Sequence, residues 1–105
     1  MKLEGIGLDA DALEAIRQVL ARFSAVEEAI LYGSRAKGTF RPGSDIDLTL
    51  KGPHLVQRDL LNIAIALDDL LLPWKFDLSW YDGLANQQLI EHIDRIGITL
   101  YTRVT

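Results

Sequence analysis

The sequence has 105 residues, of which 49% are hydrophobic, so it is long enough for one compact domain with a core and too short for two. It carries 11 Lys and Arg against 15 Asp and Glu, a net charge of -4, which disfavours direct binding to DNA or RNA. Because there are no cysteines, disulfides and thiolate metal sites are excluded, and any metal must be bound by oxygen or imidazole ligands.

The first predicted element is a helix from about Asp9 to Phe23. Its apolar residues recur at three- and four-residue spacing, Asp9 is placed to cap the N-terminus, and Asp11 lies in the first turn. The apolar run of residues 29–32 then predicts a short buried strand that ends at Gly33.

A single turn of helix is expected over residues 34–37, followed by a loop over residues 39–44 that contains a Pro-Gly pair. Residues 46–50 alternate apolar and polar side chains, which predicts a second strand with one buried face. Residues 55–72 are helical by length and spacing.

Residues 76–80 alternate again and predict a third strand, with Asp77 and Ser79 on one face. The pattern from Leu84 to Ile96 predicts another helix, and residues 98–101 a last strand. We therefore expect an α/β (α+β) fold, a small mixed sheet of about four strands covered by helices, with residues 1–105 forming one domain.

The chain start and the most apolar stretch favour neither export nor a membrane span. Residues 1–7 contain Glu4 and two glycines where a signal peptide needs a long apolar run. The stretch from Leu60 to Leu72 contains several polar residues and falls well short of the roughly 20 residues that span a bilayer. We expect a cytoplasmic protein without membrane contact.

Three acids are the candidate metal ligands. Asp45 and Asp47 are two residues apart at the start of a predicted strand, so their carboxylates leave the same face roughly 7 Å apart. This separation suits two divalent cations about 3.5–4 Å apart if a third carboxylate completes the site, and Asp77 of the next strand is the candidate. Oxygen ligands favour Mg²⁺.

A candidate phosphate site precedes these acids. Gly33 lets the backbone approach a ligand closely, and the amides of Ser34 and the residues after it open a short helix. The Ser34 hydroxyl and the Lys37 ammonium group supply further contacts to phosphates.

The pattern Gly-Ser, then ten residues, Asp-x-Asp, and a later strand Asp resembles the DNA polymerase beta-like nucleotidyltransferase superfamily. It is most similar to the minimal, MNT-type members, and the resemblance is strongest from Ala29 to Leu50. The resemblance implies that Gly33, Ser34 and Lys37 bind a nucleoside triphosphate such as ATP. It also implies that Asp45, Asp47 and Asp77 bind two Mg²⁺ ions and catalyse transfer of AMP or another nucleoside monophosphate to a hydroxyl group.

Larger members of the superfamily carry an added domain that binds the base or the acceptor, and this chain has no residues left for one. The resemblance to MNT antitoxins implies a helical HEPN ribonuclease toxin as partner, silenced when AMP is placed on its tyrosine. Two alternatives stay open: a catalytically silent partner-binding module, and a transferase for a small molecule such as an aminoglycoside, with the acceptor pocket formed between subunits of a homo-oligomer.

Other residues receive no catalytic role from the sequence. Arg35 and Arg41 are expected to be surface or loop-bracing residues, and the two histidines, His54 and His92, lack metal-ligand spacing. In the helix of residues 55–72, three apolar residues fall on the polar side, which suggests a partner surface: Leu61, Ile65 and Leu72.

Overall fold

The computed structural model describes residues 5–104, and their elements follow one another in the predicted order. The helices are α1 (Ala10–Ala21), α2 (Gly33–Lys37), α3 (Gln57–Asp68) and α4 (Gln87–Ile96), with a 3₁₀ turn, η1 (Tyr81–Gly83). The strands are β1 (Glu28–Tyr32), β2 (Ile46–Lys51), β3 (Phe76–Trp80) and β4 (Ile98–Thr102). In α1, the Asp9 carboxylate accepts the Ala12 N–H at 2.7 Å, which confirms the predicted cap.

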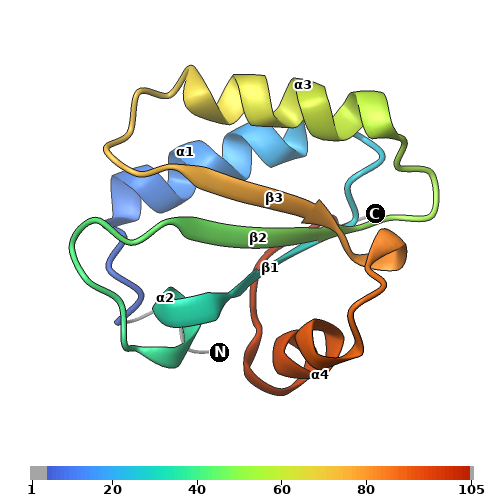
Figure 1. The fold of residues 1–105 in the computed structure, drawn as a ribbon. Helices are drawn as coiled ribbons and strands as arrows, with labels where there is room; N and C mark the ends of the chain where they lie inside the picture. Colours follow the sequence, from blue (N-terminus) through green and yellow to red (C-terminus); the bar gives the residue numbers. More distant parts are fainter. Residues whose placement is uncertain (1–4, 105) are drawn as a thin grey trace.

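The four strands form one mixed sheet in the order β3-β2-β1-β4. β1 is antiparallel to both of its neighbours, β2 and β4, whereas β2 and β3 are parallel. A parallel pair needs a crossover connection, and α3 supplies it. α1 and α3 cover one face of the sheet, and α2 and α4 lie on the other (Figure 1). The predicted α/β fold with a small mixed sheet is confirmed.

The main hydrophobic core lies between the sheet and the α1–α3 layer. Its fully buried members include Ile16, Leu20, Leu31, Leu48, Leu50, Ile63 and Leu67. A smaller cluster on the opposite face contains Ile30 and Tyr32 of β1 and Ile93 of α4. Successive side chains of β1 point to opposite faces of the sheet, and both faces are covered, so they alternate between the two clusters. Tyr32 lies on the face of α2 and α4.

The helix predicted over residues 55–72 is shorter at both ends. Val56 is extended, and its N–H donates to the Asp59 carboxylate at 3.1 Å, so the helix begins at Gln57. At the other end Leu71 has a φ of +56°, a left-handed conformation that stops helix propagation, and Pro73 disfavours helical backbone at the residue before it.

Two further expectations from periodicity were wrong. Leu84 lies before α4, because the Asn86 side chain accepts the Leu89 N–H at 3.1 Å and caps the helix at that point. Thr49 was expected on the open face of its strand but is fully buried. Both faces of this sheet are covered, so a polar position in the alternation need not reach solvent.

The expected apolar strip on α3 is confirmed in part. Leu61 and Ile65 are 61% and 53% exposed. Leu72 is half-buried and contacts the main core, because it lies beyond the end of the helix and the chain turns back towards the sheet there. Within residues 5–104, none of the helices is both long enough and apolar enough to cross a membrane.

Candidate active site

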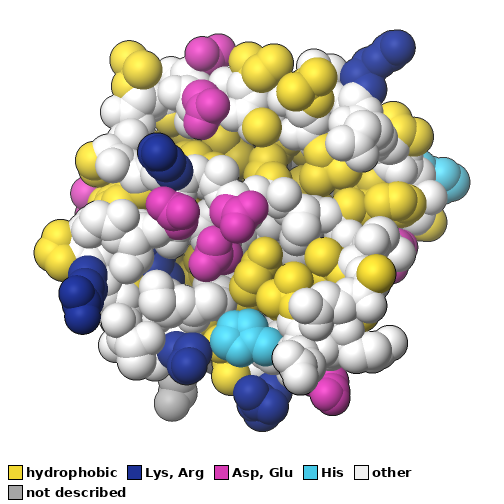
Figure 2. All heavy atoms as spheres, in the orientation of Figure 1, with side chains coloured by type: hydrophobic (Ala, Val, Ile, Leu, Met, Phe, Trp, Pro, Cys, Tyr) yellow, Lys and Arg dark blue, Asp and Glu magenta, His cyan; other side chains and the backbone are white. Residues whose placement is uncertain are grey.

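The sheet brings Asp47 and Asp77 together. They are register partners on the parallel strands β2 and β3, whose backbones run about 4.8 Å apart, so their side chains leave the same face. Asp47 also faces Tyr32 across the β1–β2 pair, which places all three on the side of α2 and α4. Asp45 is exposed just before β2 begins. Figure 2 shows acidic side chains gathered over this part of the sheet.

The carboxylates lie close enough to repel one another. Burial raises the pKa of Asp47 above its usual range, and the negative charges of Asp77 and Asp45 raise it further, while the Arg35 guanidinium opposes the shift. Burial also raises the pKa of Tyr32, with added contributions from Asp77 and Asp47. Keeping these neighbouring carboxylates ionised therefore costs free energy unless a cation neutralises their charge.

Gly33 forms the turn from β1 into α2 and contacts Asp47. Its φ is +75°, in the left-handed region that favours glycine. A Cβ at this position would overlap Oδ2 of Asp47. The glycine of the Gly-Ser motif is therefore required by geometry, because only a residue without a side chain lets the chain turn beside the carboxylate.

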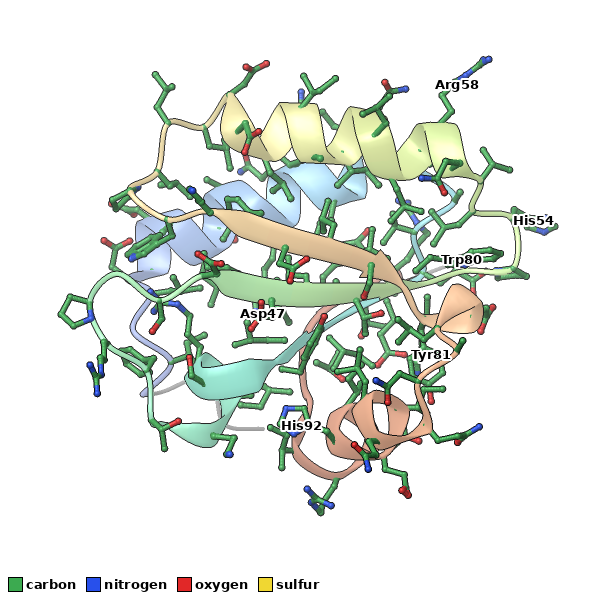
Figure 3. All side chains as sticks on the ribbon, viewed as in Figure 1. Asp47, His54, Arg58, Trp80, Tyr81 and His92 are labelled. Carbon is green, nitrogen blue, oxygen red and sulfur yellow. The ribbon has the colours of Figure 1, made fainter. Side chains whose placement is uncertain are left out.

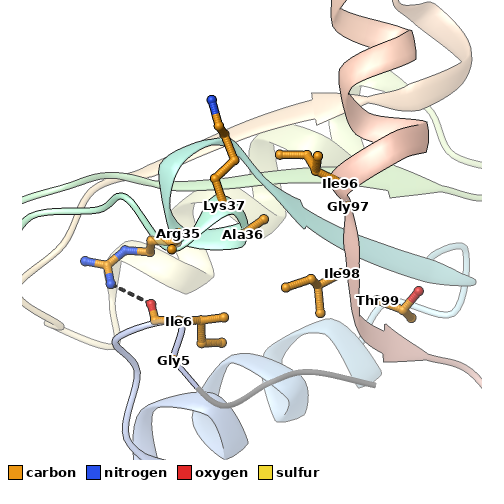
Figure 4. Close-up of a pocket in the computed structure, with 10 residues that line it drawn as sticks. Gly5, Ile6, Arg35, Ala36, Lys37, Ile96, Gly97, Ile98 and Thr99 are labelled. Atoms are coloured by element: carbon orange, nitrogen blue, oxygen red, sulfur yellow. Dashed lines mark hydrogen bonds between the residues drawn. The ribbon is translucent and has the colours of Figure 1, made fainter.

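Ser34 and Lys37 lie at different ends of α2. Ser34 is half-buried in the first turn next to Gly33, whereas Lys37 is the last residue of the helix and is exposed. Lys37 borders a cavity of about 930 Å³ between α2, the N-terminal segment and the α4–β4 junction (Figure 4). None of the three acids lines this cavity. The structure thus places Gly33 beside the acids and Lys37 one helical turn away.

His92 is a site residue that sequence analysis missed. Its Nε2 accepts the Gly33 N–H at 3.3 Å, and its ring meets the Tyr32 ring edge-on, with centroids 6.3 Å apart. It projects from α4 towards the start of α2, on the face that carries Asp47 (Figure 3). No spacing pattern could have revealed this, because His92 and Gly33 are 59 residues apart in the chain.

Arg35 braces the loop before β2, as expected, but it is buried and not on the surface, with only 1% of its area exposed. Its guanidinium donates to the Ser44 carbonyl from Nε at 3.3 Å and from Nη2 at 2.9 Å, and to the Ile6 carbonyl from Nη1 at 2.9 Å. It also lies over the rings of Phe40 and Trp74. Arg35 thereby fixes the segment that leads into Asp45 and Asp47.

We expect Arg35→Met to lower the free energy of unfolding by about 2 kcal/mol, because it leaves buried carbonyl groups without donors. Arg35→Lys should recover only part of this loss, since a single ammonium cannot reproduce the planar set of donors. Chemical denaturation of the two variants checks the expectation. Arg41→Met is the control, because Arg41 is exposed in the loop that Arg35 braces. Equal stability of the Arg35→Met and Arg41→Met variants would contradict it.

The donor set suits a hard divalent cation. Carboxylate oxygens are the ligands that Mg²⁺ prefers, and the mutual repulsion at Asp47 is what such an ion would relieve. The carboxylates do not form a closed cluster, however: within residues 5–104, no three His, Cys, Asp or Glu side chains are grouped closely enough to hold a metal ion. The metal roles of Asp45, Asp47 and Asp77 therefore stay predictions.

Comparison with protein-family models gives a match over most of the chain. The family model described as "Polymerase beta, Nucleotidyltransferase" matches residues 14–105. No curated protein is significantly similar to the chain in sequence.

Several solved structures share the fold. One is the crystal structure of a toxin–antitoxin with AMP-PNP, with a TM-score of 0.71, 22% identity, and coverage of 87% of this chain and 73% of that chain. Another contains the tri-AMPylated Shewanella oneidensis HEPN toxin in complex with MNT antitoxin, with a TM-score of 0.65, 19% identity, and coverage of 88% and 71%. A third is the toxin–antitoxin MntA–HepT, with a TM-score of 0.66, 18% identity, and coverage of 90% and 74%.

The family model spans most of the chain, and its match includes the Gly-Ser turn and all three acids. The protein therefore belongs to the polymerase beta nucleotidyltransferase family.

Proposed function

We propose that this protein transfers AMP from ATP to a tyrosine hydroxyl of a HEPN-type ribonuclease toxin and thereby acts as its antitoxin. The observation that carries the proposal is the pairing of Asp47 with Asp77 on parallel strands, beside the Gly33 turn. Family membership supports nucleotidyl transfer. The choice of acceptor is supported by fold similarity to complexes that contain an AMPylated HEPN toxin or a nucleotide analogue.

Each candidate residue has a role that its position allows. Gly33 and Ser34 would hold the triphosphate at the start of α2, with Lys37 contributing positive charge from the last turn. Asp45, Asp47 and Asp77 would hold two Mg²⁺ ions, which neutralise developing charge on the phosphates when bound. This leaves Asp47, the most shielded of the three acids, at the centre of the site.

The transfer itself needs little from the protein beyond orientation. Asp77 is exposed on β3, where its carboxylate can accept the proton of an incoming tyrosine hydroxyl. The tyrosine oxygen then forms a bond to the α-phosphorus of ATP, and the bond from that phosphorus to the bridging oxygen breaks in line, releasing pyrophosphate. The products are the AMP–tyrosine ester and pyrophosphate.

In the proposed reaction the partner supplies the acceptor. Within residues 5–104 the elements build one sheet with its covering helices, and we propose that residues 1–105 act as one cytoplasmic domain. A tyrosine on a folded helical partner can approach the exposed Asp77 directly. No nucleic acid is needed for this reaction, in keeping with the net charge of -4.

The test is AMP transfer from α-labelled ATP in Mg²⁺, with and without the protein encoded by the neighbouring gene, beside an Asp47→Asn control. Label on a partner tyrosine that disappears in the control would support the proposal. Absence of label, together with tight partner binding by both versions, would favour a silent binding module. Label on an aminoglycoside without any partner would favour a small-molecule transferase.

A further inference from the structure

A hydrogen bond connects α4 with the Gly33 turn, although the proposed transfer reaction gives no residue of α4 a role. His92 accepts a hydrogen bond from the backbone N–H of Gly33, and Gly33 in turn lies against the Asp47 carboxylate. Nε2 can accept this hydrogen bond only when it carries no proton of its own. One imidazole nitrogen therefore fixes the backbone at the meeting point of the triphosphate residues and the acids.

We propose that His92 is a positioning residue of the nucleotide site, which holds the Gly33 turn in the conformation that binds the triphosphate. This inference rests on the proposed nucleotidyl transfer and adds a residue outside the Gly-Ser and Asp-x-Asp motifs. His92 acts through Gly33: without the acceptor, the N–H loses its partner and the left-handed turn loses the contact that orients it beside Asp47.

The attachment of α4 to the sheet does not depend on this hydrogen bond. Ile93 is 2% exposed in the smaller core cluster, Leu89 packs against the same cluster, and the Tyr81 hydroxyl donates to Asp94 at 2.7 Å. His92 is only half-buried beside them. A side chain that served packing alone would need no nitrogen at this position, since the edge-on contact with Tyr32 requires only a ring.

Two substitutions separate the ring from the acceptor. His92→Phe keeps an aromatic ring against Tyr32 and removes the acceptor, whereas His92→Gln removes the ring and keeps an oxygen at about the distance of Nε2. His54→Phe is the matched control, because His54 is exposed and lies far from Asp47 (Figure 3). Circular dichroism melting of each variant reports whether the fold is retained.

The measurement is calorimetric binding of a non-hydrolysable ATP analogue in Mg²⁺, followed by kcat and KM for AMP transfer. We expect His92→Phe to weaken analogue binding about tenfold and to raise the KM for ATP, with a melting temperature close to that of His92→Gln. His92→Gln and His54→Phe should bind within about twofold of the unsubstituted protein. A KM effect rescued by Gln is not expected of a residue that only stabilises the fold.

Three outcomes would overturn the inference. Equal binding by His92→Phe and the unsubstituted protein would show that the acceptor is dispensable while leaving nucleotidyl transfer intact. Equal weakening by the Phe and Gln variants would show that an acceptor at this position does not restore binding, as expected of a residue that only stabilises the fold. Absence of analogue binding by the unsubstituted protein would remove the proposed function together with the role of His92.

Discussion

Asp47→Asn is expected to abolish AMP transfer while raising the melting temperature at neutral pH. The transfer rate should fall by at least about 1,000-fold, because the carboxylate at the centre of the proposed metal site is lost. Stability should rise because burial and the charges of Asp77 and Asp45 penalise the ionised Asp47 in the folded protein. Labelled-AMP transfer and thermal melting of the same preparation measure the two effects.

The stability gain expected for Asp47→Asn should depend on pH. The pKa of Asp47 is raised above its ordinary value of 3.8, so the folded state binds this proton more tightly than the unfolded state. The contribution of Asp47 to stability therefore decreases as the pH rises from 3.8 through the folded-state pKa. The advantage of Asp47→Asn over the unsubstituted protein should accordingly shrink on acidification towards pH 3.8.

Asp68→Asn is the control, because Asp68 is an exposed acid at the end of α3 on the opposite face of the sheet. It should leave both transfer and the pH dependence unchanged. Mg²⁺ should raise the melting temperature of the unsubstituted protein and of the Asp68→Asn variant but not of Asp47→Asn. Retained transfer by Asp47→Asn, or a lower melting temperature at neutral pH, would contradict the role given to Asp47.

Gly33→Ala should both destabilise the fold and disable the site. A non-glycine residue in the left-handed region costs roughly 1–2 kcal/mol, and the new Cβ would overlap Asp47 Oδ2. Relief of that overlap requires the carboxylate or the turn to move. We expect a loss of about 3 kcal/mol in unfolding free energy, measured by denaturant titration, and a loss of about 100-fold in transfer, since small displacements at a reacting centre are costly.

Gly38→Ala is the control that separates the cost of the left-handed conformation from the cost of the overlap with Asp47. Gly38 ends α2 with a φ of +81°, close to that of Gly33, but a Cβ there would meet no atom within 4 Å. The control should therefore show only the conformational cost, about 1 kcal/mol, and almost full transfer activity. Equal effects of the two substitutions would mean that contact with Asp47 does not matter.

Local sequence patterns were sufficient to predict the strands that carry Asp47 and Asp77. Residues 76–80 were predicted as a strand and form β3, and the strand predicted over residues 46–50 forms β2. Strand alternation also placed Asp77 and Ser79 on one face, as observed. Less was predictable where end effects dominate: α3 is shorter than its apolar pattern, because Leu71 and the capping interaction at Val56 set its limits.

The sequence by itself determined the order of elements and the Gly-Ser and Asp-x-Asp positions, because these depend on short-range periodicity and on motifs contiguous in the chain. Only the tertiary structure decided which acids meet, through the parallel register of Asp47 with Asp77. It also decided that Arg35 is buried and that His92 holds Gly33. Such contacts join residues far apart in the chain, so they depend on how α4 and the N-terminal segment pack on the sheet and leave no periodic signal.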